Sequence, residues 1–269
     1  MALDEIQMRI LQEVADLHTV PEGAYNIRSN GALAGRNSTA NIEIVSKPDG
    51  TGIDIHIKPG TKNESVHIPV VLSESGLKDV VYNDFFIGED ADVVIVAGCG
   101  IHNCGNQDSQ HDGVHRFFVG KNAKVKYVEK HYGEGDGTGK RILNPVTEVT
   151  MDQGSSMEME MVQIKGVDST VRTTRAVLAA DASMVVRERL MTHGEQKARA
   201  STLPSSTATA PGPMWYPGAW PRTAPIRSLT PGLSATPPAP ATPNATPSSW
   251  ALPGFWQYPS WRPTTSTPP

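Results

Sequence analysis

Between about residue 40 and residue 190, short apolar runs follow one another, and in most of them every second residue is apolar. This alternation, together with many β-branched residues, is typical of strands whose two faces differ. The runs are Ile42–Ile44, Ile53–Ile57, Val66–Leu72, Val80–Ile87, Val93–Ala97, Val114–Val119, Val125–Val128, Val146–Met151, Met157–Ile164, Val171–Leu178 and Met184–Leu190. Clusters of turn-forming residues separate the runs, and no helical pattern of ordinary length interrupts them. The sequence therefore predicts a mainly β domain.

The strands carry a weak repeat. The pattern Gly-x-x-Ala-x-Val occurs at Gly88–Val93 and at Gly120–Val125, and looser copies begin at Gly154 and Ala180. The intervals from residue 88 to 120 and from 120 to 154 are 32 and 34 residues. Repeated strand-and-turn units of this size favour a solenoid, in which each coil buries its apolar edge on the next. A β-sandwich also contains many short strands, so the alternation alone does not decide.

The chain begins with a different period. Apolar residues at Leu3, Ile6, Ile10, Val14 and Leu17 recur at steps of three and four, which predicts a helix with one apolar face. Pro21 ends the segment. We interpret it as a helix that docks on the rest of the chain; a helix that binds a partner is the alternative.

The last part of the chain differs sharply in composition. All 28 acidic residues precede residue 201, whereas residues 201–269 hold 17 of the 22 prolines and all five tryptophans. A segment rich in Pro, Ala, Thr and Ser, without acidic residues and with few aliphatic ones, does not build an ordinary core. It is interpreted either as a disordered Pro-rich tail or as the product of a reading-frame slip near residue 200.

Charge and composition exclude several classes of protein. A net charge of −4 gives no support for nucleic-acid binding. No run of 18 or more apolar residues is present, which predicts no membrane span, and the N-terminus lacks the pattern of a secretory signal. We expect a cytoplasmic protein. In a reducing compartment, Cys99 and Cys104 are expected to be free thiols or metal ligands rather than a disulfide.

The densest polar cluster lies between Ala97 and His115, and it contains five side chains of types that bind metals. They are Cys99, His102, Cys104, His111 and His115. Thiolate and imidazole groups bind zinc, copper and iron–sulfur centres, and the Cys-x-x-His-x-Cys spacing is compact enough to converge on one ion. The spacing does not match a two-pair zinc signature. The alternative is a glycine-rich corner between strands, with the thiols half-buried and the histidines hydrogen-bonded.

Three further patterns have structural interpretations. A thiolate pair of Cys99 or Cys104 with His102 or His111 is conceivable, but the sequence does not indicate a third, orienting group. The glycine-rich segment Gly133–Lys140 matches neither the phosphate-loop nor the dinucleotide fingerprint, which predicts a turn and no bound nucleotide. Alternating methionines at residues 157, 159 and 161 predict a strand with buried thioethers rather than a soft-metal stripe.

Several segments resemble the short members of the SufB/SufD family of iron–sulfur cluster assembly scaffolds. They are Val20–Arg28, Ser38–Ile44, Ser75–Asp84, Val96–Asn103, Lys140–Pro145 and Glu188–His193. The likeness runs nearly continuously over residues 1–198, and it is more specific than any single motif. It implies a right-handed parallel β-helix core that pairs with itself or with a SufB/SufD paralogue. It also implies a SufC-type ATPase partner and a transient iron–sulfur cluster, and it implies a scaffold rather than an enzyme.

The resemblance ends near Ala198. Family members continue with coils that carry a Gly-His-x-x-Cys-Asp-like stretch and with a helix that docks the ATPase, and this chain has no matching residues for either. The expected domains are a helix at 1–20, the core at 21–198 and the tail at 199–269. Two alternatives stay open: an enzyme with a metal or thiolate centre at Cys99–His115, and a truncated product without function.

Overall fold

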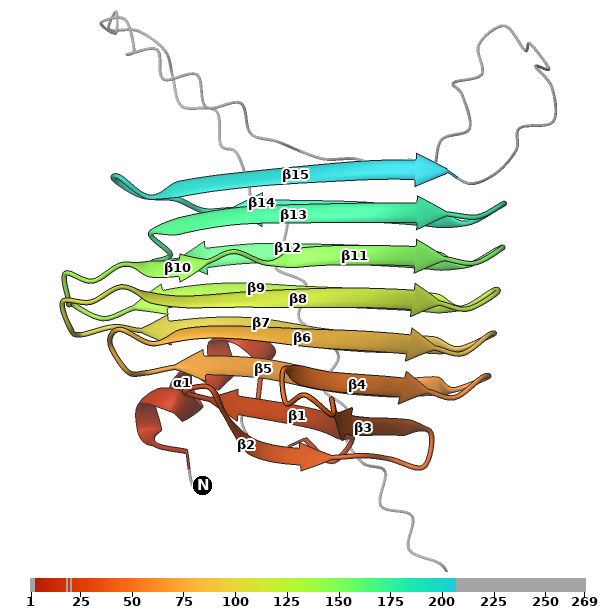
Figure 1. The fold of residues 1–269 in the computed structure, drawn as a ribbon, viewed down its shortest axis with the longest axis horizontal. Helices are drawn as coiled ribbons and strands as arrows, with labels where there is room; N and C mark the ends of the chain where they lie inside the picture. The colour runs from red at the N-terminus through yellow and green to blue at the C-terminus, as the bar shows by residue number, and fades with distance from the viewer. Residues whose placement is uncertain (1–2, 18, 20, 207–269) are drawn as a thin grey trace, which may run out of the picture. The chain divides into compact units, whose positions relative to one another are not determined.

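The computed structural model describes residues 3–17, 19 and 21–206, which form one short helix followed by a β-solenoid (Figure 1). The helix α1 spans Glu5–Ala15. One sheet, which we call sheet A, contains β1 (Ala24–Ser29), β2 (Ala32–Asn37), β5 (Lys62–Leu72), β7 (Asp92–His102), β9 (Lys124–Glu134), β12 (Ser156–Lys165) and β14 (Ser183–Leu190). The other, sheet B, contains β3 (Ile42–Ser46), β4 (Gly52–Ile57), β6 (Lys78–Ile87), β8 (Ser109–Val119), β10 (Arg141–Leu143), β11 (Val146–Met151), β13 (Ser169–Leu178) and β15 (Lys197–Ser206).

From β5 onward each coil passes through sheet A and then through sheet B, and each long strand pairs in parallel with its equivalents in the neighbouring coils. Phe85 pairs with Phe117, and Phe117 pairs with Val149, so one coil here takes 32 residues. In the next coil Val149 pairs with Ala176, an interval of 27 residues. The predicted solenoid is confirmed, with about five turns.

The repeat in the sequence reflects one recurring turn between sheet B and sheet A. Its residues Asp90, Asn122, Gly154 and Asp181 all have a left-handed backbone, with φ between 56° and 69°. Asn, Asp and Gly adopt this conformation more readily than other residues. Each copy of the turn therefore has Asp, Asn or Gly at this position.

The main core lies between the two sheets. Phe85 and Phe117 stack there with ring centroids 4.4 Å apart, and the ladder continues into Val149 and Ala176. The methionines at 157, 159 and 161 project into this core and are 2% exposed or less. Buried packing, the structure predicted for this stripe, is confirmed.

Helix α1 docks on the outer face of sheet A, as the first of the two interpretations predicts. The Asp4 side chain caps the helix by accepting a hydrogen bond from the Gln7 backbone N–H at 2.8 Å, and the Asp4 backbone N–H donates to the Gln7 side-chain oxygen. Ile10 and Val14 are fully buried in a second apolar cluster formed by the helix and the sheet. The helix can approach β7 this closely because Gly98 carries no side chain toward it.

We predict that Gly98→Ala loosens this contact. A Cβ at position 98 would lie 2.4 Å from the Val14 carbonyl oxygen, so the helix must move. Overpacking of this kind costs about 1–3 kcal/mol, which denaturant unfolding can measure. Gly23→Ala is the control, because its Cβ would lie 3.5 Å from the Ser65 carbonyl oxygen, an ordinary contact. Equal stability of the two variants would contradict the explanation.

The structure adds two features to the expected organisation, one at each end of the described core. Strand β15 pairs with β13 along its whole length and ends at Ser206, so regular pairing continues beyond residue 198. The remainder of the expected tail, 207–269, lies outside the described residues.

Near the start, β1 and β2 form an antiparallel hairpin that the sequence analysis missed. Its turn is Asn30-Gly31, with positive φ at both residues. In the part of the chain that the structure describes, no helix has the length and apolarity needed to cross a membrane.

Candidate functional site

The five predicted metal-binding side chains fall into two groups on opposite faces of the coil. Cys99, on β7, and His111 and His115, on β8, point into the interior and are at most 5% exposed. His102 lies on the outward face of β7, and Cys104 follows in the loop, where it is exposed. The five side chains therefore do not meet at one point, because residues 99 and 102 are three apart and a strand alternates its faces every residue. Both cysteines are free thiols.

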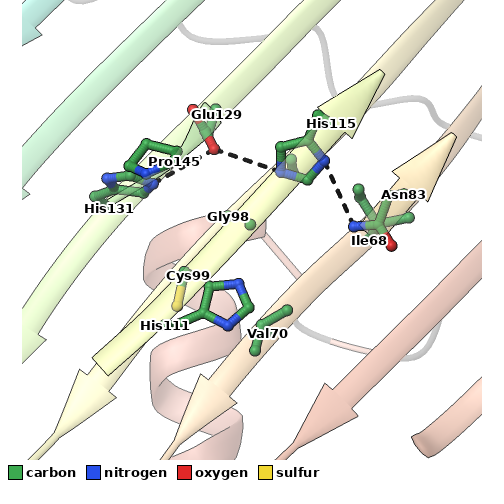
Figure 2. A pocket seen from close by; sticks show the side chains of 12 residues that line it. Ile68, Val70, Asn83, Gly98, Cys99, His111, His115, Glu129, His131 and Pro145 are labelled. Atoms are coloured by element: carbon green, nitrogen blue, oxygen red, sulfur yellow. Dashed lines mark hydrogen bonds and ion pairs between the residues drawn. The ribbon is translucent and has the colours of Figure 1, made fainter. Parts of the chain in front are cut away.

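The interior group belongs to a belt of polar side chains that crosses the coil between two apolar clusters. Its members are Asp79, Asn83, His111, His115, Glu129, His131, Gln163, Arg172 and Glu188, and all are at most 8% exposed. Figure 2 shows Glu129 between His131 and His115, with Asn83 on the far side of His115. A cavity of about 10 Å³ lies among these residues, Cys99 and His111, which is room for about one water molecule.

Arg172 is the only positively charged side chain of this belt at every pH of interest, and it is fully buried. Its guanidinium hydrogen-bonds Glu129, and the same nitrogen lies 2.9 Å from the Met161 sulfur. Its Nε lies 3.7 Å from Glu188 Oε1. Burial alone would raise the pKa of Glu129, but the charge of Arg172, aided by interactions with His131 and His115, outweighs it and holds that pKa well below its usual value. Glu129 is therefore a buried carboxylate.

The histidines near Glu129 are neutral at physiological pH. Burial lowers the pKa of His115 to about 4, because the loss of solvation outweighs the attraction of Glu129. Burial also lowers the pKa of His131, whose Nε2 lies 3.4 Å from Glu129 Oε1. The Asn83 amide donates to His115 Nδ1 at 3.5 Å, which places the ring proton on Nε2, on the side of Glu129.

His111 belongs to a second buried pair. Its Nδ1 lies 3.0 Å from Asp79 Oδ2, and Arg28 donates to the other carboxylate oxygen at 3.2 Å. Burial alone would raise the pKa of Asp79, but His111 and Arg28 outweigh it and lower that pKa. Cys99 lies on the same side of the cavity, and burial, reinforced by Asp79 and Glu129, raises the pKa of its thiol well above the usual value. Cys99 is therefore a protonated thiol without access to solvent.

The outer group is a relay of hydrogen bonds. Cys104 Sγ lies 3.0 Å from His102 Nε2, and His102 Nδ1 lies 3.0 Å from Glu134 Oε1. Tyr132 donates to the other Glu134 oxygen at 2.9 Å, and Arg9 of α1 also donates to the carboxylate. Partial burial alone would raise the pKa of Glu134, but the bonds from Arg9, His102 and Tyr132 together lower it. This group supplies the orienting third residue that the sequence did not indicate.

The two groups suit different roles. Among the described residues, no three His, Cys, Asp or Glu side chains are placed to hold a metal ion. The interior belt has no room for a substrate, and its contacts from Glu129 to Arg172 and His115 link strands of the two sheets. The outer group presents a thiol, a base and a carboxylate at the surface.

Sequence reasoning missed Glu129, His131, Glu134 and Arg172. A signal existed for the first two, because they continue the alternation of Val125 and Tyr127 and so share the inward face of β9. Arg172 likewise shares the inward face of β13 with Ala176 and Leu178. Glu134 is on the outward face of β9, and two of its three partners, Arg9 and His102, come from other segments of the chain.

Three comparisons with known proteins were made. No protein-family model, no curated protein and no solved structure matches the chain.

Proposed function

We propose that the chain is a cytoplasmic scaffold of iron–sulfur cluster assembly that works with a separate SufC-type ATPase. One observation carries the proposal: the β-solenoid implied by the SufB/SufD resemblance is the fold of the residues that show the resemblance. In this role the nascent cluster is cargo, and the chain pairs with itself or with a SufB/SufD paralogue.

The structure of the glycine-rich segment after β9 supports the proposal that ATP is bound by a separate protein. Its Gly137 amide donates to the Asn103 carbonyl at 3.1 Å, and its Gly139 amide donates to the Gly105 carbonyl at 3.0 Å. These amides hold two neighbouring loops together. A phosphate-binding loop needs such donors free and pointing at the ligand.

The outer face of sheet B supports a role in binding other proteins. Phe86 and Phe118 stack there with centroids 5.1 Å apart, and His56 extends the stack. Val80 and Val171, on the same face, are about half exposed. Exposed apolar groups gathered on one face mark surfaces that bind partners.

Co-expression of the tagged full chain with a SufC-type ATPase tests the proposal. We expect the ATPase to co-purify with the chain, and an unrelated β-solenoid carrying the same tag to capture none. We also expect the isolated chain to bind no ATP. Failure of the ATPase to co-purify, or ATP binding by the chain alone, would argue against the scaffold role.

A further inference from the structure

We propose that Cys104 is a nucleophilic thiol that exchanges with low-molecular-weight disulfides and carries a mixed disulfide on the outer surface of the coil. This modification is independent of the scaffold role. It rests on the relay of Cys104, His102 and Glu134, in which an exposed thiol, an imidazole and a carboxylate follow one another at 3.0 Å steps.

The hydrogen bonds of the relay show which atom of each group donates a proton and which accepts one. Glu134 is held as a carboxylate by Arg9 and Tyr132, so His102 donates its Nδ1–H to it. The Nε2 lone pair of His102 then faces the Cys104 thiol and can accept its proton. Nucleophile, base and orienting acid thus stand in the order that activates thiols in other proteins.

The surroundings favour disulfides over acyl substrates. Attack on a carbonyl needs donors placed for an oxyanion, whereas displacement at sulfur proceeds through a linear arrangement of three sulfur atoms and needs none. The amide of Gly105, next to Cys104, is already committed to the Asn103 side chain at 3.0 Å. Since Cys104 lies at the surface, a small disulfide can reach it without a binding pocket.

The Cys104 proton moves to His102 Nε2, and Cys104 Sγ bonds to one sulfur of the disulfide while the S–S bond breaks. The leaving thiolate then takes the proton from His102 and departs as a thiol. The small disulfide is the oxidant, and a small thiol reverses the reaction.

Two other side chains, Asp136 and Cys99, allow the expected reactivity of Cys104 to be compared within the same chain. Interaction with the Cys104 thiol lowers the pKa of the exposed Asp136 carboxyl. This carboxylate competes with His102 for the thiol proton and opposes a negative charge on sulfur. Replacing Asp136 with a neutral residue should therefore make Cys104 more reactive.

Cys99 differs from Cys104 because it is buried and held as a thiol. We therefore expect one reactive cysteine and one inert one.

The experiment follows the reaction of the folded full chain with a chromogenic aromatic disulfide, and with oxidised glutathione, by absorbance and mass. We expect one adduct, at Cys104, that forms faster than in the urea-unfolded chain and is absent from Cys104→Ser. His102→Gln should slow the reaction by about tenfold or more. Glu134→Gln should slow it less, and Asp136→Asn should accelerate it. Glu148→Gln, which removes an equal charge from an exposed position elsewhere, should leave it unchanged.

The pH dependence separates a base from a merely structural histidine. With His102 present, the rate should persist at low pH, where the rate of His102→Gln has already fallen. Both proteins should have the same thermal midpoint. The proposal is overturned if Cys104 reacts no faster in the folded chain than in urea. It is equally overturned if His102→Gln changes neither the rate nor its pH profile.

Discussion

Arg172→Met is expected to lower the free energy of unfolding by about 3–5 kcal/mol, the usual loss when one partner of a buried ion pair is removed. Arg172 is fully buried and is the cation that compensates Glu129 and approaches Glu188. Without it, two carboxylates remain inside the coil with neutral histidines around them. Methionine fills similar volume, so the loss reports charge rather than a cavity. Urea unfolding at neutral pH measures it.

Arg175→Met is the matched control on the same strand. Arg175 points outward, is 56% exposed and lies 3.5 Å from Glu148, and an exposed pair of this kind contributes about 0–1 kcal/mol. Adding Glu129→Gln to Arg172→Met should recover part of the lost stability, because it removes one uncompensated charge. A loss for Arg172→Met no larger than that for Arg175→Met would show that the interior belt does not hold the coil together.

Acidification from pH 6.5 to pH 4 is expected to destabilise the fold by roughly 3 kcal/mol through His115 alone. The pKa of its ring falls from the ordinary 6.5 to about 4 on folding. Between these values the unfolded chain binds a proton that the folded chain does not, so stability rises with pH across this window. Burial lowers the pKa of His131 as well, which acts in the same direction.

Glu129 acts in a different range. Because its folded pKa is lowered, its contribution is complete above its ordinary value of 4.5 and is lost only as the pH falls through the folded value. Urea midpoints across the pH range separate the two effects. His115→Gln should flatten the curve between pH 6.5 and pH 4, whereas His193→Gln, at an exposed position, should not. A flat curve for the wild-type chain in that window would contradict the neutral buried state of His115.

The sequence predicted the strands best where they are rich in β-branched and aromatic residues. Val80–Ile87 and Val146–Met151 correspond closely to β6 and β11. The prediction ended β7 at Ala97 and began β8 at Val114, although the strands continue to His102 and start at Ser109. In these stretches the inward side chains include Cys99 and His111. The outward glycines of β7 leave space for α1. Neither face therefore shows the alternation of apolar residues that predicts a strand.

The candidate site was harder to predict than the fold. The alternation within a strand could have separated Cys99 from His102, because it is a local property. The partners could not be found in this way, since Glu134 lies 32 residues from His102 and Arg172 lies 43 residues from Glu129. Those distances in sequence become contacts only once the coils stack in a defined register.

Titration of the full chain with a purified SufC-type ATPase, with and without ATP, tests the scaffold role most directly. The account predicts a saturable complex of fixed stoichiometry whose affinity changes when ATP is added, because the nucleotide state of the ATPase has to act on the scaffold. Absence of a complex under both conditions, with the chain shown to be folded by its strand-rich circular dichroism, would contradict it.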